Sequence, residues 1–235
     1  MIIVLRHDET AQVIIHTANM IPRDWANMTQ GVWRSPLLPL LAEIRPGGNP
    51  VPAVGSGERF QADLINYLLA YDNKRVTCKP LADQLKKFDF SAVRGALIAS
   101  VPGRHDVSED AETRWGWAAV KQALRSVPVK SGNSEVVVQV SSIATLGVTD
   151  AWLQETLFGR PGMGGRAKQP QPNFKIVFPT PDEIRRSLDG YGSGGSIHTK
   201  MQLGKEGPAQ KQLRWMTPML CHWGNDAEKG ASRFR

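Results

Sequence analysis

Cysteine is scarce in this 235-residue chain, and its scarcity excludes several kinds of site. The two cysteines, Cys78 and Cys221, lie far apart and form neither a CxxC pair nor a Cys/His ligand spacing. A disulfide framework or a zinc site needs several such residues at short, regular spacing. No paired acidic metal motif occurs either. We therefore expect two buried free thiols, no bound metal and no cofactor.

Long apolar runs are also lacking. No run approaches the roughly 20 residues that a membrane-spanning helix needs, and the N-terminus lacks the charged-then-apolar order of a signal peptide. With 41% hydrophobic and 22% charged residues, the composition is typical of a soluble intracellular protein without a membrane partner. There is no P-loop, GxSxG or HExxH motif, which excludes the commonest nucleotide, esterase and metalloprotease sites.

Positive charge is concentrated in the last third of the chain. Residues 1–159 carry 16 Lys/Arg and 16 Asp/Glu, whereas residues 160–235 carry 13 against 6 and hold the whole formal excess of +7. A basic surface attracts polyanions through a salt-dependent term that ignores sequence. Part of the charge lies in a loop near 159–172 that is rich in Gly, Pro and Gln. This composition fits a mobile insertion as well as a binding platform.

Apolar periodicity alternates between the strand type and the helix type along the chain. Short β-branched runs predict strands, and apolar residues three or four apart predict helices. The fold class that follows is α/β, with mixed sheets covered by helices. Five prolines within 36–52 predict an irregular loop there. The expected strands are 1–5, 12–17, 29–33, 96–100 and 135–140, and the expected helices are 58–71, 80–87, 109–127, 149–158 and 206–223.

Two neutral amides, Asn19 and Gln30, are the candidate functional side chains of the N-terminal third. Asn19 follows the apolar strand that contains residues 13–15, and Gln30 opens the next extended segment. If the two segments run side by side, both carboxamides can face one spot. A carboxamide donates and accepts hydrogen bonds without adding charge, so such a pair suits orienting a catalytic imidazole or holding an anionic oxygen.

The strings VIIHTANMIPRDW, TQGVW and SPLLP, all within residues 13–39, carry a resemblance to a known family. They resemble the segment after the first His-x-Lys motif of the tyrosyl-DNA phosphodiesterases, in the phospholipase D superfamily, with wording closest to fungal members. Asn19 and Gln30 match the family's Asn and Gln at this motif. The resemblance implies that the motif's own His and Lys lie upstream of Met1.

The same resemblance implies a two-domain organisation. Residues 1–103 correspond to the remainder of a first phospholipase D-like domain and residues 104–235 to the beginning of a second. The string SVPGRH at 100–105 resembles the family's junction between them. Because the chain opens directly in a strand, we expect a fragment in which both domains are incomplete.

Three residues match positions at which the family contacts DNA. Ser142 and Thr145 lie in QVSSIATLG, a small-residue turn after a strand, whose hydroxyl and N–H groups suit a phosphate. The chain has Ala144 and Thr145 where the family carries Gly and Ser, which weakens the match at Thr145. Lys211 matches a family lysine near the DNA.

A literal His-x-Lys occurs at His198 and Lys200, but we interpret it as a decoy. A catalytic motif of this kind lies on a strand and is followed by a second strand that ends in Ser/Ala-Asn. Here the pattern of 206–223 predicts a helix. The preceding GYGSGGS at 190–196 resembles a family segment some distance before the second motif, which implies that this motif lies beyond Arg235. His222 has no Asp or Ser partner nearby in the sequence.

For the whole protein the resemblance implies a monomeric nuclear DNA-repair enzyme, a phosphoric diester hydrolase. Its partner is DNA with a 3′-phosphotyrosyl or topoisomerase-derived peptide adduct, cleaved through a phosphohistidine intermediate. This chain is expected to be inactive alone. Two other readings stay open on the residues: a non-catalytic nucleic-acid-binding module that uses the basic C-terminal third, and a soluble α/β domain of another role.

Overall fold

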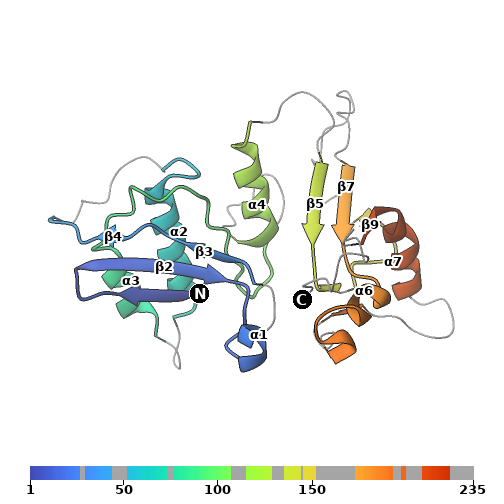
Figure 1. Ribbon diagram of the computed structural model, residues 1–235. Helices are drawn as coiled ribbons and strands as arrows, with labels where there is room; N and C mark the ends of the chain where they lie inside the picture. Colours follow the sequence, from blue (N-terminus) through green and yellow to red (C-terminus); the bar gives the residue numbers. More distant parts are fainter. Residues whose placement is uncertain are drawn as a thin grey trace, which may run out of the picture. The chain divides into compact units, whose positions relative to one another are not determined.

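The computed structural model divides the chain into two compact units (Figure 1). Unit 1 comprises Met1–Thr17 and Gly31–Pro128, and unit 2 comprises Ala18–Gln30 and Val129–Arg235. The predicted boundary at 103/104 concerns homologous domains and stays a prediction. The structure describes residues 1–26, 30–43, 52–72, 77–106, 115–128, 135–143, 145–151, 173–192, 197–199 and 208–222.

Unit 1 is built on an antiparallel sheet. The expected hairpin is confirmed as β1 (Ile2–Leu5) and β2 (Thr10–His16). β3 (Val32–Arg34) pairs with the other edge of β2, so the segment after Gln30 does run beside the first, as predicted. β4 (Leu38–Pro39) also pairs with β2. The sheet therefore brings the two ends of the Ala18–Gln30 excursion together.

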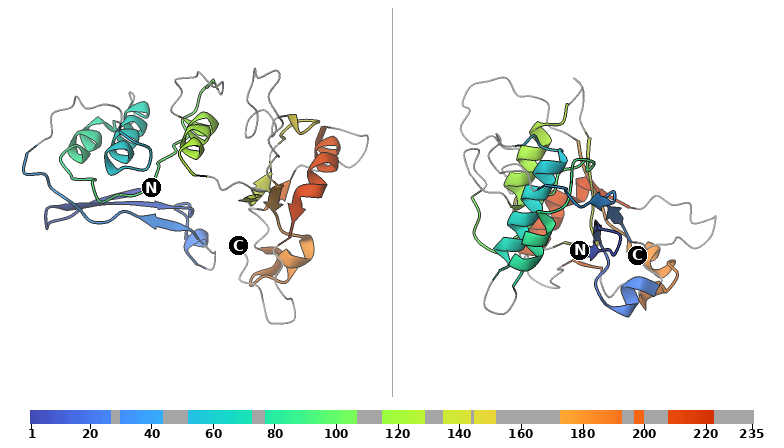
Figure 2. Two further views of the ribbon diagram at one scale, coloured as in Figure 1. Left: turned by 90° about the horizontal axis from the view of Figure 1, so that it is seen from above. Right: turned by 90° about the vertical axis from the view of Figure 1, so that its left-hand side faces the viewer.

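Two helices, α2 (Gly57–Ala70) and α3 (Lys79–Leu85), cover one face of this sheet (Figure 2). α2 begins where predicted, because the Ser56 hydroxyl accepts a hydrogen bond from the Arg59 N–H at 3.2 Å. Alternate residues of β2 and every fourth residue of α2 face inward, as their periods of 2 and 3.6 require. The buried core consists of Ala11, Val13, Leu38, Phe60, Leu64, Leu68, Ala82, Leu85, Phe88, Phe90 and Val93.

Two predictions for unit 1 were wrong. Residues 96–100 are not a buried strand: within the described residues they make one isolated bridge, from Ala99 to Trp115, and Ile98 is exposed. An apolar run becomes a strand only when a neighbour supplies a ladder of hydrogen bonds. The loop at 36–52 contains β4, whose Leu38 is fully buried.

The helix expected at 109–127 is shorter where the structure describes it. α4 spans Gly116–Arg125, and residues 107–114 lie outside the described residues. Trp115 is its N-cap residue, and Leu124, expected near the inner face, is exposed. α4 therefore adds no buried residue to the core of unit 1.

Unit 2 contains a parallel sheet in the order β5 (Glu135–Gln139), β7 (Asn173–Val177) and β9 (Leu220–Cys221). A second, two-stranded sheet pairs β6 (Ser142–Ile143) with β8 (His198–Thr199), also in parallel. The expected mixed α/β class is thus confirmed. The helices are α1 (Pro22–Ala26), α6 (Pro181–Arg185), α7 (Pro208–Met216) and the 3-10 turn η3 (Thr217–Met219).

The helix predicted at 206–223 ends early. α7 stops at Met216, Pro218 lies in the 3-10 turn, and Leu220 starts β9. Proline cannot continue the helical hydrogen bonding, and the next residues find a parallel partner in β7. Ile143, Ile176 and Met216 form the buried centre of this unit. Most of the helix predicted at 149–158 lies outside the described residues.

Both cysteines are free, as predicted, although each is half-buried rather than fully buried. Among the residues described, no helix has the length and apolar character needed to cross a bilayer.

The N-terminus of α2 allows a sharp test of the unit 1 packing. A Cβ on Gly57 would lie 1.7 Å from the Phe90 carbonyl oxygen, so the backbone would have to shift. We expect Gly57→Ala to lower the free energy of unfolding by about 1–3 kcal/mol or more in urea denaturation. Gly31→Ala is the matched control, because its new Cβ would meet Thr17 at an ordinary 3.6 Å. Equal stability of the two variants would contradict this packing.

The β1–β2 turn makes a prediction about pH. Hydrogen bonds from Arg6 and then Thr10 lower the pKa of the Asp8 carboxyl from 3.8 to about 2. A carboxyl whose pKa is lowered by folding stabilises the chain above pH 3.8, and this contribution is lost as the pH falls toward 2. Arg6→Met should raise the Asp8 midpoint in a carbon-detected NMR titration. Lys86→Met, which removes a partner of Asp83 instead, should leave it unchanged.

Candidate phosphate-binding site

The segment that carries both candidate amides leaves the unit 1 sheet and returns to it at adjacent points. At its base the Thr17 N–H donates to the Gly31 carbonyl at 3.1 Å, and the Gly31 N–H donates to the Thr17 hydroxyl at 2.8 Å. β2 ends at His16 and β3 begins at Val32. The pairing of β2 with β3 therefore sets the two attachment points of the Ala18–Gln30 segment.

Asp24, on α1, holds both candidate amides. Its Oδ2 accepts from the Asn19 N–H at 2.7 Å and from Asn19 Nδ2 at 2.8 Å. Gln30 Nε2 donates to the Asp24 carbonyl at 3.1 Å. Asp24 is only 6% exposed, and a buried carboxylate needs such donors. The structure thus brings the two amides to one residue, as their convergence required.

The bond to Asp24 determines which way the Asn19 carboxamide points. An ionised carboxylate only accepts, so the group facing it is the amide nitrogen. Oδ1 of Asn19 is consequently turned away from Asp24, available to accept from a protonated imidazole or ammonium. The Trp25 indole N–H donates to the Asn19 carbonyl at 2.8 Å and holds the backbone as well.

Sequence reasoning missed Asp24. The available signal was weak: an acidic residue in the first turn of a short helix, two residues after Pro22. That position is common for structural carboxylates, because helix N-termini favour negative charge. Only the fold shows that this carboxylate binds back to Asn19.

The three predicted DNA-binding residues are all exposed and belong to unit 2. Ser142 lies on β6, Thr145 follows that strand, and Lys211 lies on α7. β6 and α7 contribute Ile143 and Met216 to the same core cluster. The strand and the helix that carry these polar residues are therefore packed together, although their contact with DNA stays a prediction.

His198 lies on β8, opposite Ser142 in the parallel register, and not in an irregular segment. This placement removes one argument for treating His198-x-Lys200 as a decoy; Lys200 itself is outside the described residues. The other argument stands, because α7 comes next and β9 is followed by His222 rather than by Asn. The decoy interpretation stays a prediction.

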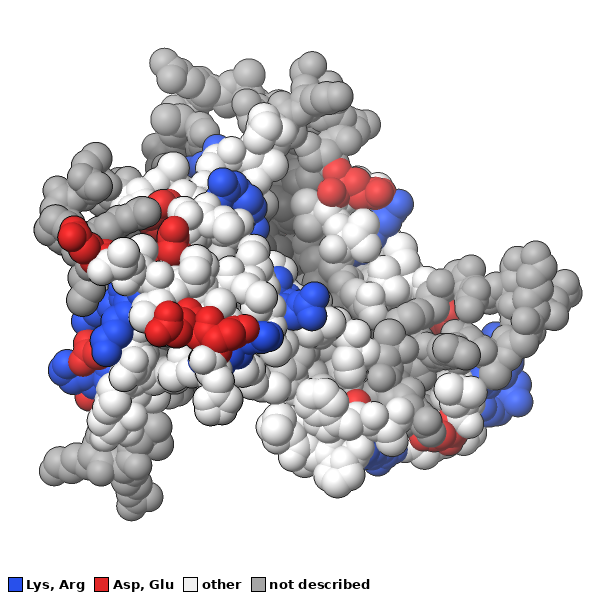
Figure 3. Space-filling view, turned by 60° about the vertical axis from the view of Figure 1, so that its left-hand side comes forward, with Lys and Arg blue, Asp and Glu red and all other residues white. Residues whose placement is uncertain are grey.

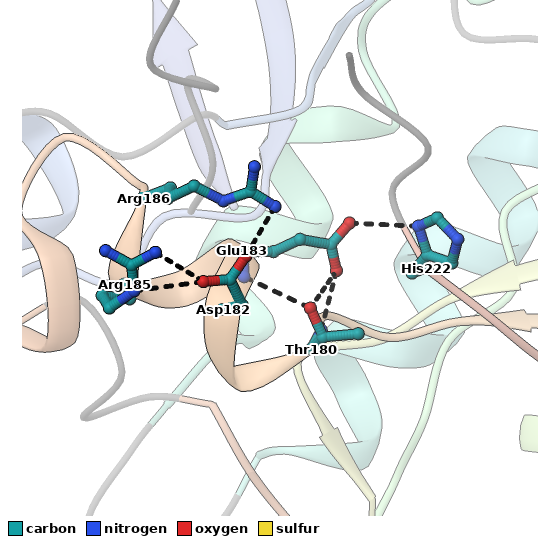
Figure 4. A network of polar contacts seen from close by, with 6 residues as sticks. All are labelled: Thr180, Asp182, Glu183, Arg185, Arg186 and His222. Carbon is teal, nitrogen blue, oxygen red and sulfur yellow. Dashed lines mark hydrogen bonds and ion pairs between the residues drawn. The ribbon is translucent and has the colours of Figure 1, made fainter. Parts of the chain in front are cut away.

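A polar network surrounds the start of α6 (Figure 4). Glu183 Oε2 accepts from the Thr180 N–H at 2.7 Å, completing a capping box, and Glu183 Oε1 lies 3.4 Å from His222 Nδ1. The carboxylate partner of His222 thus comes from 39 positions earlier in the chain, which inspection of its sequence neighbours did not reveal. Arg185 and then Arg186 hold the pKa of Asp182 below its usual value.

The predicted basic surface is only partly described. Five of the 13 Lys/Arg of residues 160–235 fall within the described ranges, and three of those five form ion pairs with carboxylates. On the face in Figure 3 the described cations and carboxylates are interspersed. The loop near 159–172 lies outside the described residues. Among the residues described, no group of three or more His, Cys, Asp or Glu could hold a metal ion.

The family model described as "Tyrosyl-DNA phosphodiesterase" matches residues 1–235. The chain belongs to the tyrosyl-DNA phosphodiesterase family. It is 31% identical over 239 residues to tyrosyl-DNA phosphodiesterase 1 of Drosophila melanogaster, covering 97% of this chain and 37% of that protein. It is 28% identical over 271 residues to a probable tyrosyl-DNA phosphodiesterase of Schizosaccharomyces pombe, covering 92% of this chain and 48% of that protein.

Solved structures agree on the fold. The yeast tyrosyl-DNA phosphodiesterase matches 97% of this chain and 53% of its own length, with a TM-score of 0.65 and 19% sequence identity. The chain spans half or less of the length of these curated tyrosyl-DNA phosphodiesterases. The family resemblance predicted from residues 13–39 is thus confirmed over the whole chain.

Asp24 gives the tyrosyl-DNA phosphodiesterase site a direct test. Asp24→Leu leaves the Asn19 N–H groups without their acceptor, so we expect a stability loss of about 1–3 kcal/mol. Hydrogen exchange at Asn19 Nδ2, followed by NMR, should become faster. Asp24→Asn is the matched control, because its carbonyl oxygen can replace Oδ2. If Asp24→Leu left Asn19 exchange unchanged, the anchoring role would be wrong.

Proposed function

We propose that residues 1–235 are part of a DNA-repair phosphodiesterase that hydrolyses 3′-phosphotyrosyl and related 3′-end adducts of DNA. The observation that carries the proposal is the pair of carboxamides at Asn19 and Gln30, both bound to the buried Asp24. Membership of the tyrosyl-DNA phosphodiesterase family and the printed names of its relatives support the substrate class. DNA bearing a tyrosyl or topoisomerase-derived peptide is the proposed partner.

The proposed reaction proceeds in two displacements on phosphorus. A histidine nitrogen attacks the phosphorus and the bond to the tyrosine oxygen breaks, while a second histidine gives that oxygen a proton. The second histidine then removes a proton from water, which attacks the phosphohistidine and releases a 3′-phosphate. Splitting one displacement into two is the benefit of a covalent intermediate.

Asn19 and Gln30 act in this scheme as neutral orienting groups. A carboxamide fixed by Asp24 can meet the charge that develops on phosphoryl oxygens, or on an imidazolium, without reorganising. Amides and lysines supply this stabilisation by themselves, so the proposed chemistry requires no metal. We assign both histidines to His-x-Lys motifs outside residues 1–235, in two phospholipase D-like domains to which 1–103 and 104–235 belong. A monomer acting in the nucleus completes the proposal.

A 5′-labelled oligonucleotide ending in 3′-phosphotyrosine tests this division of roles. The 235-residue chain should bind it without releasing tyrosine, because the nucleophile and the general acid are supplied elsewhere. Tyrosine release that His198→Ala abolishes would overturn the decoy interpretation.

The orienting role is tested in a longer protein that adds a His-x-Lys motif on each side of these residues. There, Asn19→Ala or Gln30→Ala should lower kcat by about 10²-fold, the usual cost of one lost donor at an oxyanion. Arg34→Ala, on β3 outside the Ala18–Gln30 segment, is the control. Binding without turnover even in the longer protein would favour a non-catalytic nucleic-acid-binding module.

A further inference from the structure

Two side chains of α7 hold the backbone of the loop after β6. Oε1 of Gln212 accepts from the Leu146 N–H at 2.7 Å, and the Trp215 indole N–H donates to the Gly147 carbonyl at 3.3 Å. Gln212 is only 4% exposed, so its hydrogen bond forms away from water, where loss of a partner is costly. These contacts join residues 66 and 68 positions apart in the sequence.

The helical period explains why one turn of α7 can both hold the loop and face solvent. Gln212 and Trp215 are three residues apart and share a face, and Met216 continues that face into the core. Lys211 precedes Gln212 by one position, about 100° around the helix, and is exposed. The buried amide and the exposed ammonium thus sit on adjacent residues of a single rigid element.

The loop itself has little freedom once these bonds form. Ile143, just before it, is buried, and Leu146 packs against the same cluster as Trp215. Gly147 has φ +120°, a conformation that side-chain-bearing residues rarely adopt. Thr145 lies between these fixed points with its side chain exposed. The position of Thr145 relative to Lys211 is therefore set by α7.

We propose that Gln212 and Trp215 are positioning residues that join Thr145 and Lys211 into one surface for consecutive phosphates of single-stranded DNA. The loop contributes neutral hydroxyl and N–H donors, and Lys211 contributes the charge. This inference rests on the proposed function, because it assumes a DNA strand as the ligand.

Fluorescence anisotropy of the 235-residue chain with a labelled single-stranded oligonucleotide, measured across salt concentrations, tests the proposal. Lys211→Ala should reduce the slope of log K against log salt by about 0.7, the value for one phosphate on a single strand. Gln212→Met, which keeps the side-chain length but loses the acceptor, should weaken binding about 10-fold with the slope unchanged. A structural collapse would instead change the slope and the melting temperature together.

Two further variants make the test specific. In a Thr145→Val background, Gln212→Met should cost little more, because both changes remove the same loop contact. Trp215→Phe removes only the indole N–H and should give a smaller loss of the same kind. Leu213→Met, a volume-conserving change on the same helix, is the control and should leave affinity unchanged.

The outcomes separate the two proposals. If the unmodified chain does not bind the oligonucleotide, the proposed function fails and this inference with it. If the chain binds but the Gln212 and Thr145 effects are additive, or Gln212→Met has no effect, only the positioning role is overturned.

Discussion

The buried carboxylate of Asp24 is the interaction on which the candidate site depends. α1 has five residues, too few to be stable as an isolated helix, so its place in the Ala18–Gln30 segment has to be set by contacts. Asp24 supplies them through the backbone and side chain of Asn19 and through Gln30. Since each bond is buried or half-buried, breaking one exposes a polar group without a partner. The orientation of Asn19 is thereby determined before any ligand arrives.

The loop after β6 follows the same physical rule with other groups. There a buried amide, Gln212, accepts from the backbone, and an indole donates to it. In both places a polar side chain inside the protein has one way to be satisfied, so it selects one conformation of a segment that carries exposed candidate ligands. Phosphate recognition requires such fixed donors, because a flexible loop would lose conformational entropy on binding.

Local signals were sufficient for much of the secondary structure. The β1–β2 hairpin and α2 were predictable because alternation, helical spacing and the Ser56 cap act within a few residues. The segment at 96–100 failed because an apolar run does not reveal whether a neighbouring strand exists. α7 was extended too far because Leu220 fits a helical face equally well until its pairing with β7 is known. β7 and α6 were not predicted at all.

The sequence alone determined the family and the two carboxamides, because residues 13–39 preserve a motif and because the residue types themselves define what can donate and accept. Only the tertiary structure decided that Asp24 anchors Asn19, that Glu183 faces His222, and that Gln212 holds the loop at Leu146. Asp24 lies five positions from its partner, and the other two lie 39 and 66 positions away. Which polar group meets which depends on the path of the folded backbone between them, and no local pattern encodes that path.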